Sequence, residues 1–479
     1  AGTDPALDWT DAVRRGLNTL TFDATSVLTT IGSYAFKYNA LTSVTIPSSV
    51  TFIGIDAFRY NNLTSSIILP ASVTTIGNDS FSNNPNLTDV TINSPQINAS
   101  QAFNNIAPTI TTVNIGPGVT AASGLFTGST GIGTLDIAAN AVTNSSSFNN
   151  FAIGTLTVDG TATISSSSFF SSTITLGTIG NGITLQNGAF INANFTTLNI
   201  GDNLTTGVSS FGDVTIGTMT IGDNAEIVGS TFNAQTSITN LTIGENSNIL
   251  VSASQGLEVL NNLIIGDDAT ISQNCFAGVD VGGGVTIADN AVIGVTAFQG
   301  LGTGTNLTIG DDATISTRAF QNGNISGNVT IGDDAIIENG ANALAGAFFN
   351  ASILGSLSIG VNSDIQGYSF RDNIGASTIT NLTIGSGSTL GIESFSYHPY
   401  LSFSLGNNLT FGSGVFRNAT LTGNFTIDPT WTLAQDSLDQ MNIIGDFIVP
   451  NNEVLPLSVF SDGSIDGDLV LGTNVTISD

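Results

Sequence analysis

The 479-residue sequence predicts a mainly β fold, a parallel-stranded, right-handed solenoid of about 21 repeats of about 22 residues each, with a short N-terminal capping helix. Three observations predict it. A short apolar phrase such as "LTIGDDA" (307–313) recurs along the chain at nearly constant spacing. A phenylalanine recurs about halfway between successive phrases, and each phrase alternates apolar and polar residues as a half-buried strand does.

The spacing of the phrase fixes the repeat. Most steps between its last apolar residues are 21 to 24 residues long, and four irregular steps of 28, 25, 27 and 16 fall between Ile331 and Ile427. The series of these residues is Phe22, Ile46, Leu69, Ile92, Ile115, Ile137, Val158, Ile179, Ile200, Ile221, Ile243, Ile265, Ile287, Ile309, Ile331, Ile359, Ile384, Phe411, Ile427, Val449 and Leu471.

Eighteen of the 28 phenylalanines share one slot of the repeat, from Phe36 to Phe460. We expect Leu438 to fill this slot once, and the unit around residues 249–257 has no obvious occupant. Since a single turn could not bury its own apolar face, stacked turns are expected to place these rings in an interior column. Each buried ring contributes about 1.5–3 kcal/mol. A Gly or Pro after the phrase, as at Gly310 and Pro47, indicates a turn.

The charge balance limits the partners. Seven Lys and Arg stand against 36 Asp and Glu, for a net charge of −29. Such a surface repels phosphate backbones and anionic lipids, which argues against nucleic-acid binding. No stretch reaches the ~18 apolar residues of a membrane span, so direct membrane insertion is not expected. Cys275 is the single cysteine, and its apolar neighbours predict a buried, unreactive thiol.

Two stretches carry a recognisable consensus. "LTSVTIPSSVTFIGIDAF" (41–58) and "LTSSIILPASVTTIGNDSF" (63–81) resemble the BspA-like, or Treponema-type, leucine-rich repeat. The resemblance is close over 20–109, whereas 110–479 is divergent and acidic. It implies a secreted or cell-surface protein that uses its repeats for adhesion or protein binding, and similar repeats occur in virus and phage surface proteins. The resemblance carries no catalytic residues.

The domain organisation follows from the repeat. Residues 1–19, "AGTDPALDWTDAVRRGLNT", are expected to form the helical cap, and 20–479 one continuous solenoid with insertions near 339–355 and 394–406. "GDLVLGTNVTISD" (467–479) is still a repeat with no cap after it. We therefore expect that the native chain continues beyond it, or that self-association through this uncapped C-terminal coil covers the open edge.

Acidic residues recur after the phrase in consecutive turns. Stacking would place them in a row about 5 Å apart, where like charges repel. Either this row is a solvated acidic edge, or Ca²⁺ bridges it, since carboxylate oxygens suit calcium. The candidate calcium ligands are Asp267, Asp268, Asp289, Asp311, Asp312, Asp333 and Asp334. No other cofactor is expected.

The insertion 394–406, "SFSYHPYLSFSLG", gathers aromatic residues and the single histidine of the chain. Loops on a rigid scaffold often bind ligands, so Tyr397, His398 and Tyr400 form a candidate binding loop. The alternative is that they fill an enlarged turn. No Ser, Cys or Asp arrangement accompanies the histidine, so it supports no catalytic triad.

The sequence therefore predicts a non-enzymatic, extracellular or cell-surface repeat protein that presents an extended surface to protein or glycan ligands for adhesion or assembly. Two alternatives stay open: a structural subunit of an extracellular filament or surface layer, and a virion or phage-tail structural protein located at the virion surface. One Lys and one His leave almost no place for Schiff-base or histidine chemistry.

Overall fold

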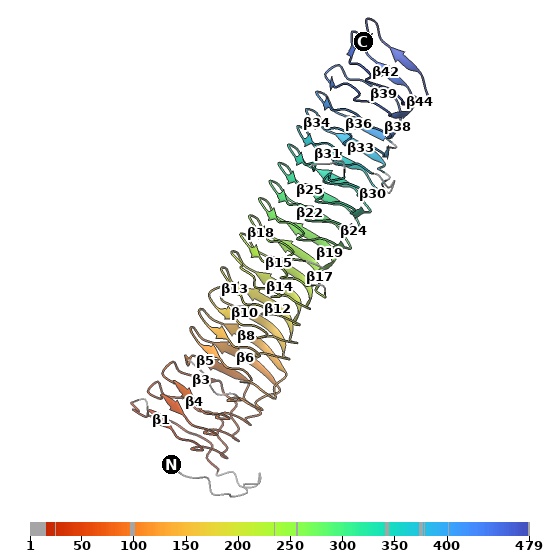
Figure 1. Cartoon of the computed structure of the whole chain (residues 1–479). Coiled ribbons are helices and arrows are strands. Elements are labelled where there is room, and N and C mark those ends of the chain that lie inside the picture. The colour runs from red at the N-terminus through yellow and green to blue at the C-terminus, as the bar shows by residue number, and fades with distance from the viewer. Residues whose placement is uncertain are drawn as a thin grey trace. The chain divides into compact units, whose positions relative to one another are not determined.

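The computed structural model describes residues 16–23, 25–95, 101–233, 235–254, 257–340, 344–372, 377, 379–400 and 402–477. They form two compact units, 1–217 and 218–479. Each unit is a parallel β-solenoid in which one turn of chain lies on the next (Figure 1), with about 20 turns altogether. The described residues include no helix. The predicted repeat domain 20–479 is thus seen as two units that share one turn architecture.

Unit 1 has two kinds of strand in each turn, and both pair in parallel with the neighbouring turns. The longer strands are β3 (Ile67–Leu69), β5 (Asp89–Ile92), β6 (Thr109–Ile115), β8 (Gly131–Ile137), β10 (Ala152–Val158), β12 (Thr173–Ile179) and β14 (Asn194–Ile200). The two-residue strands are β1 (Thr30–Ile31), β2 (Phe52–Ile53), β4 (Thr75–Ile76), β7 (Thr120–Ala121), β9 (Val142–Thr143), β11 (Thr163–Ile164) and β13 (Thr184–Leu185). Strand β15 (Thr215–Ile221) contains the boundary between the units.

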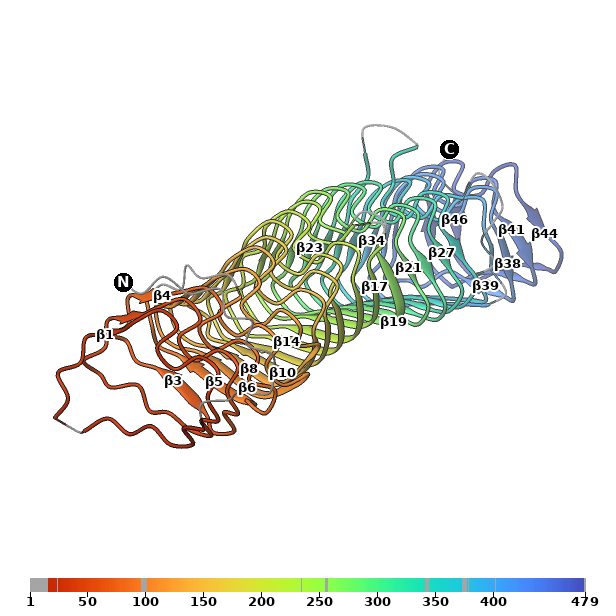
Figure 2. The same cartoon turned by 90° about the horizontal axis from the view of Figure 1, so that it is seen from below.

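Unit 2 repeats this plan. Its main sheet contains β17 (Ser237–Ile243), β19 (Glu258–Ile265), β22 (Val285–Ile287), β25 (Leu307–Ile309), β28 (Val329–Ile331), β31 (Leu357–Ile359), β33 (Asn381–Ile384) and β36 (Ser402–Leu405), flanked by β21 (Asp280–Val281), β24 (Gly302–Thr303), β27 (Asn324–Ile325) and β30 (Ser352–Ile353). The short-strand sheet contains β16 (Glu226–Ile227), β18 (Asn248–Ile249), β20 (Thr270–Ile271), β23 (Val292–Ile293), β26 (Thr314–Ile315), β29 (Ile336–Ile337), β32 (Asp364–Ile365), β34 (Thr389–Leu390), β37 (Thr410–Phe411) and β40 (Thr432–Leu433). Figure 2 shows β23 and β34 on the side of the turns opposite to β17, β19 and β21.

Three smaller sheets complete unit 2. They consist of β35 (Pro399–Tyr400), β38 (Thr420–Thr422), β41 (Asn442–Ile444) and β44 (Ser464–Ile465); of β39 (Phe425–Thr426), β42 (Phe447–Val449) and β45 (Leu469–Leu471); and of β43 (Val454–Leu455) and β46 (Thr476–Ile477).

Strand register places like residues on like. In the main sheet of unit 1, Ile115 pairs with Ile137, Ile137 with Val158, and Val158 with Ile179. These side chains are buried, while the residues between them point outward. The period-2 alternation of the sequence therefore becomes one apolar and one polar column along the stack.

The phenylalanine slot forms the predicted interior column. Neighbouring ring centroids from Phe36 to Phe211 lie 5.1 to 6.5 Å apart with the planes nearly parallel. In unit 2, rings from Phe276 to Phe416 lie 4.7 to 5.9 Å apart. Offset stacking of this kind adds about 0.5–1.5 kcal/mol per pair to the burial of the rings. The column is confirmed in both units, and Leu438 is fully buried in its slot.

One turn interrupts the column. The backbone N–H of Phe232 donates to the carbonyl of Ala253, and that of Ser254 to the carbonyl of Cys275, which puts Ser254 in the phenylalanine slot. Ser254 is fully buried, and its Oγ has no hydrogen-bond partner among the described residues. This is the turn around residues 249–257, for which the sequence shows no obvious occupant.

Buried asparagines stabilise the first turns. The side-chain amide of Asn61 donates to the carbonyls of Phe36 and Phe58, both at 2.9 Å, while its Oδ1 accepts from the N–H of Leu41. Asn84 repeats this arrangement one turn later, at the carbonyls of Phe58 and Phe81. Each amide thus satisfies backbone groups that would otherwise be unpaired in the interior.

The bend in the longer strands requires glycine in several turns. A Cβ on Gly133 would lie 2.7 Å from the carbonyl oxygen of Thr111, and one on Gly154 would lie 2.5 Å from that of Gly133. Because such a Cβ would clash with backbone atoms of the neighbouring turn, a side chain at either glycine would push the turns apart.

Most of the predicted capping helix lies outside the described residues, since its residues 1–15 are not described. The four that are described, 16–19, are not helical, and Thr19 forms a parallel bridge with Ser43 in the next turn. In the predicted insertions, residues 341–343 and 401 are likewise outside the described part. Phe348 and Phe395, within or at the start of these segments, hold places in the column.

Candidate functional site

The acidic row is built from the backbone of one turn and the side chain of the turn before it. The N–H of Asp289 donates to Oδ1 of Asp267 at 3.1 Å, that of Asp311 to Asp289 at 2.9 Å, and that of Asp333 to Asp311 at 2.8 Å. Asp333 continues the pattern, accepting from the N–H of Val361 at 2.8 Å. Each of these carboxylates therefore stabilises the stack by a charge-assisted hydrogen bond.

A small residue, usually glycine, precedes each donor of the row and leaves room for the acceptor carboxylate. A Cβ on Gly310 would lie 2.1 Å from Oδ1 of Asp289, and one on Gly332 would lie 2.2 Å from Oδ1 of Asp311. Ala288 stands at this position once, and there the bond is the longest of the row, at 3.1 Å. The recurring Gly-Asp pair thus has a structural explanation.

The second acid of each turn has a different role. Asp268, Asp312 and Asp334 adopt φ values of 56°, 55° and 55°, the left-handed conformation. Asn and Asp are the non-glycine residues that tolerate it best, because their short side chains bond locally. Their side chains point to solvent, so the predicted ligand set divides into cross-turn acceptors and turn residues.

Among the residues that the structure describes, no three His, Cys, Asp or Glu side chains come together where a metal ion could bind. The hydrogen-bonded row explains the aspartates as structural elements. Calcium bridging of this row stays a prediction, tested below.

The segment 394–406 contains the three predicted binding residues. His398 is 2% exposed and Tyr400 is fully buried, whereas Tyr397 is 37% exposed. The hydroxyl of Tyr400 donates to the carbonyl of Phe395 at 3.2 Å, and its ring packs edge-on against Phe416. Of the three, only Tyr397 is available to a ligand, and the alternative of aromatic residues filling an enlarged turn describes the other two.

His398 is held in place by a hydrogen bond to the backbone. Its Nε2–H donates to the carbonyl of Phe370, and Nδ1 has no partner within the described structure. Burial lowers the pKa of His398, opposed by the Phe370 carbonyl and by the charge of Asp372. Burial likewise raises the pKa of Tyr400. Such groups are structural, since neither presents a free polar atom to solvent.

Cys275 is buried as predicted. Its Sγ donates to the carbonyls of Ile249 at 3.0 Å and Leu250 at 2.9 Å. Burial raises the pKa of the thiol to about 12. The thiolate that would act as a nucleophile is thus scarce at neutral pH.

Two ion-pair networks were not predicted from the sequence. In unit 1, Asp56 accepts from Lys37 at 2.7 Å and from Arg59 at 3.2 Å. In unit 2, Glu393 accepts from Arg371 at 3.0 Å and from Arg417 at 2.7 Å, and Arg417 also reaches Asp439 at 2.9 Å. The sequence does contain a pattern that could have indicated these networks. A basic residue directly follows a phenylalanine of the column in four turns, at Lys37, Arg59, Arg371 and Arg417.

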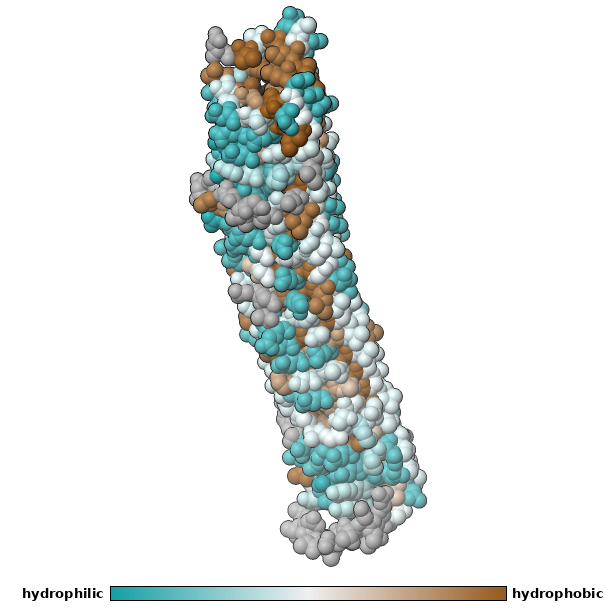
Figure 3. All heavy atoms as spheres, turned by 90° about the vertical axis from the view of Figure 1, so that its right-hand side faces the viewer, coloured by the Kyte–Doolittle hydropathy of each residue, from teal (hydrophilic) through white to brown (hydrophobic). Residues whose placement is uncertain are grey.

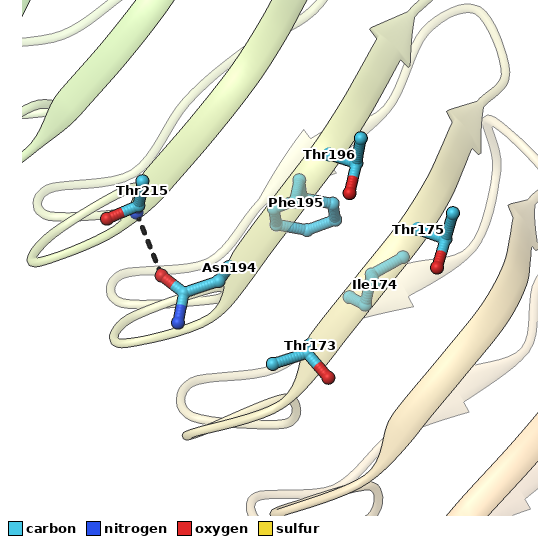
Figure 4. Close-up of a pocket in the computed structure, with 7 residues that line it drawn as sticks. All are labelled: Thr173, Ile174, Thr175, Asn194, Phe195, Thr196 and Thr215. Carbon is cyan, nitrogen blue, oxygen red and sulfur yellow. Dashed lines mark hydrogen bonds between the residues drawn. The ribbon is translucent and has the colours of Figure 1, made fainter.

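A hollow on the main sheet of unit 1 is lined by hydroxyl and amide side chains. It has a volume of about 420 Å³, and its lining residues are Thr173, Ile174, Thr175, Asn194, Phe195, Thr196 and Thr215 (Figure 4). Asn194 already accepts a 3.0 Å hydrogen bond from the N–H of Thr215. The hollow is lined by no titratable side chain, and its polar groups are threonine hydroxyls and the amide of Asn194.

The C-terminal end of unit 2 is apolar. Leu469, Val470, Leu471 and Ile477 are 44% to 59% exposed. Beside them a hollow of about 170 Å³ is lined by apolar side chains that include Phe447 and Phe460. Figure 3 shows this end, at the top of the view, as hydrophobic.

Comparison with known families identifies the type of repeat. The model of the BspA-type leucine-rich repeat region matches in six copies, and the matched residues are 15–132, 61–176, 120–216, 162–281 and 207–328. The chain belongs to the BspA-type leucine-rich repeat family. The match extends well beyond 20–109, the part closest to the consensus. No curated protein matches the chain.

One solved structure was found to match the chain, the one described as "The crystal structure of CroV588 a novel circular LRR protein structure". Its identity to this BspA-type chain is 13%, and the match covers 80% of this chain and 66% of that one, just under two thirds. The TM-score is 0.20, so this likeness carries no argument. In the described part of the BspA-type chain, no helix is long and apolar enough to cross a bilayer.

Proposed function

We propose that this BspA-type chain is a non-enzymatic, extracellular or surface-located protein that presents its repeated outer faces to protein or glycan ligands for adhesion or assembly. Leucine-rich repeat solenoids generally mediate protein–protein interactions and are typically non-enzymatic, and BspA-type proteins are often surface-associated. The net charge of −29 suits a protein that must stay soluble while it exposes long uncharged columns.

One observation carries the proposal. Most apolar residues of the described turns are buried in the interior column and in the strand pairs, and a minority such as Ile68, Leu260 and Ile264 are exposed. The outward columns repeat Thr, Ser and Asn along consecutive turns. A surface repeated in this way offers the same hydrogen-bonding groups many times. Contacts that are individually weak then add up by multivalency.

Localisation and binding test the proposal together. An antibody against the chain should label intact, unpermeabilised cells or particles, and surface protease treatment should remove the signal. Purified protein should bind immobilised surface proteins or glycans from the same source. Labelling that requires permeabilisation would contradict the proposal.

The second candidate is a subunit of a filament or surface layer that self-associates through the C-terminal coil. The exposed Leu469, Leu471 and Ile477 favour it, because unpaired strand edges with apolar side chains invite pairing. Light scattering against protein concentration tests this candidate. Growth of particles that Leu471→Asp abolishes, but Val454→Asp on β43 does not, would support the filament. The third candidate, a virion or phage-tail component, is tested by whether the chain co-purifies with particles.

A further inference from the structure

Two tyrosines in neighbouring turns of unit 1 lie ring against ring. The ring centroids of Tyr38 and Tyr60 are 4.7 Å apart, and the ring planes differ by 5°. The separation matches the roughly 4.7–4.9 Å between neighbouring strands, as expected for residues that hold the same place in successive turns. The backbone agrees with this register, because the N–H of Tyr38 donates to the carbonyl of Arg59 at 3.0 Å. Like atoms of the two phenol rings therefore lie beside each other.

Both tyrosines occupy a backbone conformation that disfavours them. Each has a φ of 58° and stands two residues after a phenylalanine of the column. A bulky residue with positive φ is an outlier that needs a reason, and such outliers concentrate at functional sites. Small or short polar residues hold this position in the following turns of unit 1, namely Asn83, Asn105, Gly128, Asn150, Ser171, Asn192 and Asp213.

Two cations hold the tyrosine rings in place. Arg59 lies 4.8 Å from the ring centre of Tyr60, and its Nη2–H donates to the Tyr60 hydroxyl at 3.3 Å. Lys37 Nζ lies 5.1 Å from the ring centre of Tyr38. Both cations are anchored on Asp56, Lys37 at 2.7 Å and Arg59 at 3.2 Å. The stacked rings are thus fixed by cation–π contacts, and because both are partly exposed, a small oxidant can reach them.

One-electron oxidation joins two phenols that are held in contact. Each phenol gives up one electron and one proton and becomes a phenoxyl radical, whose unpaired electron is shared with the ring carbons next to the C–O carbon. Two such carbons, one on each ring, form a C–C bond, and the proton that each of them carried moves to the phenol oxygen. The net loss is two hydrogen atoms, which convert one hydrogen peroxide into two waters. Contact favours coupling within the chain, because the second ring is already in place.

We propose that Tyr38 and Tyr60 form an oxidative cross-linking site, at which a peroxide used by a haem peroxidase couples the two rings to a dityrosine. The bond joins the turns of β1 and β2, whose ladder comprises only two residue pairs. A cross-link constrains the unfolded chain as a disulfide does, and a chain with one cysteine cannot form a disulfide within itself. The site depends on the geometry of the two rings and is independent of the proposed adhesive role.

Tyr397 provides an internal control. It occupies the same repeat position, two residues after a phenylalanine of the column, but Asp372 and Asn418 hold that position in the neighbouring turns. The cation it contacts is Arg371, which lies 5.1 Å from its ring centre. Since no tyrosine holds its position in either neighbouring turn, the geometry predicts no coupling at Tyr397.

The experiment treats the folded, full-length chain with hydrogen peroxide and a haem peroxidase at low protein concentration. We expect the intact monomer to lose the mass of two hydrogen atoms and to gain the blue fluorescence of dityrosine. Proteolytic digestion should yield a cross-linked peptide pair that joins Tyr38 to Tyr60. Because the coupling is within one chain, its rate should not depend on protein concentration.

Phenylalanine variants separate the phenol from the ring. Tyr60→Phe keeps a ring in the stack and removes the hydroxyl, so it should fold as the wild type does and lose the cross-link, as should Tyr38→Phe. The matched control Tyr397→Phe should leave the yield unchanged. Limited proteolysis should cut the first turns of the oxidised wild type more slowly than those of Tyr60→Phe after the same treatment.

Three outcomes would overturn the assignment. The first is a product that joins two chains, or other tyrosines of one chain, in preference to Tyr38 and Tyr60. The second is equal formation of the Tyr38–Tyr60 product after the wild type is unfolded in urea, because the stack would then not direct the coupling. The third is no coupling in the folded wild type under conditions that couple free tyrosine.

Discussion

The backbone N–H of Asp311 donates a 2.9 Å hydrogen bond to Oδ1 of Asp289, its counterpart one turn earlier. The acceptor is a side chain and the donor is backbone, so the turns are joined outside the strand ladders as well as within them. Like charges that would repel at this spacing are each offset by an amide dipole. This relationship accounts for the acidic row without a bound cation, and calcium bridging stays a prediction.

Substitution of Asp311 separates its charge from its role as an acceptor. Asp311→Ala removes the acceptor for the N–H of Asp333 and should lower the free energy of unfolding by about 1 kcal/mol. Asp311→Asn keeps the acceptor and removes a charge, and should change it by less than about 0.5 kcal/mol. Urea unfolding measures both. Equal losses in the two variants would show that the charge itself is required.

Calcium titration tests the remaining explanation of the row. Because Oδ1 of Asp267, Asp289 and Asp311 is already bonded to backbone, we expect millimolar calcium to raise the melting temperature no more than magnesium does at the same ionic strength. Differential scanning fluorimetry measures the shift. A rise specific to calcium, absent from Asp289→Asn, would establish bridging instead.

The interior column makes a strong prediction at Phe298. Its ring lies 5.0 Å from Phe276 and 5.2 Å from Phe320, so Phe298→Ala leaves a cavity between two stacked rings. We expect a loss of about 3–5 kcal/mol in the free energy of unfolding, and a smaller loss for Phe298→Leu. Urea unfolding of unit 2 measures it, and a loss below about 1 kcal/mol would mean that the turns collapse to fill the gap.

For Ser254 we expect a substitution that does not destabilise the fold, in contrast to Phe298→Ala. Its buried Oγ has no partner in the part of the chain that the structure describes, so Ser254→Ala should leave the stability unchanged or raise it by up to about 1 kcal/mol. The matched control is Ser247→Ala, because the Oγ of Ser247 donates to the carbonyl of Gly244 at 2.9 Å and accepts from the N–H of Ala225. That change should lower the melting temperature. Destabilisation by both variants alike would indicate that Ser254 is bonded.

His398 predicts a pH dependence. Its pKa is lowered from the ordinary 6.5 in the folded chain, so the unfolded chain binds the proton first as the pH falls. Its contribution to stability is complete above about pH 6.5 and is lost as the pH decreases from there toward the folded pKa. His398→Gln should flatten this part of the melting-temperature profile relative to the wild type. Parallel profiles between pH 7 and pH 5 would exclude the effect.

The architecture could be predicted from the sequence because nearly every turn repeats the same pattern of apolar, polar and aromatic residues. The slot of Phe36 and Phe58 specifies what must lie inside, and the alternation at Ile115 specifies which side faces out. With some twenty turns, errors in a single turn do not alter the register. Ser254 shows this, since the stack continues across a turn that lacks its ring.

The sites were harder to predict because they depend on neighbouring turns. Asp289 looks like a surface charge until the distance to the next amide is known. His398 and Tyr400 lie in the short segment around β35, where two residues of strand cannot indicate which side chain points inward. The ion pairs needed a comparison of neighbouring turns, because Lys37 and Asp56 are 19 residues apart.

The Gly-Asp pair also constrains how such a chain can change over generations. The aspartate of one turn packs closely on the residue before its partner in the next turn, as Asp289 does on Gly310 and Asp311 on Gly332, and Ala288 is the largest residue at this position in the row. Loss of the aspartate, or a larger side chain at the glycine, disturbs a junction, whereas duplication or deletion of a whole 22-residue segment leaves every junction with the same two partners. Unequal recombination within the gene can therefore lengthen or shorten the protein in whole-turn steps, while each retained turn still meets a compatible neighbour.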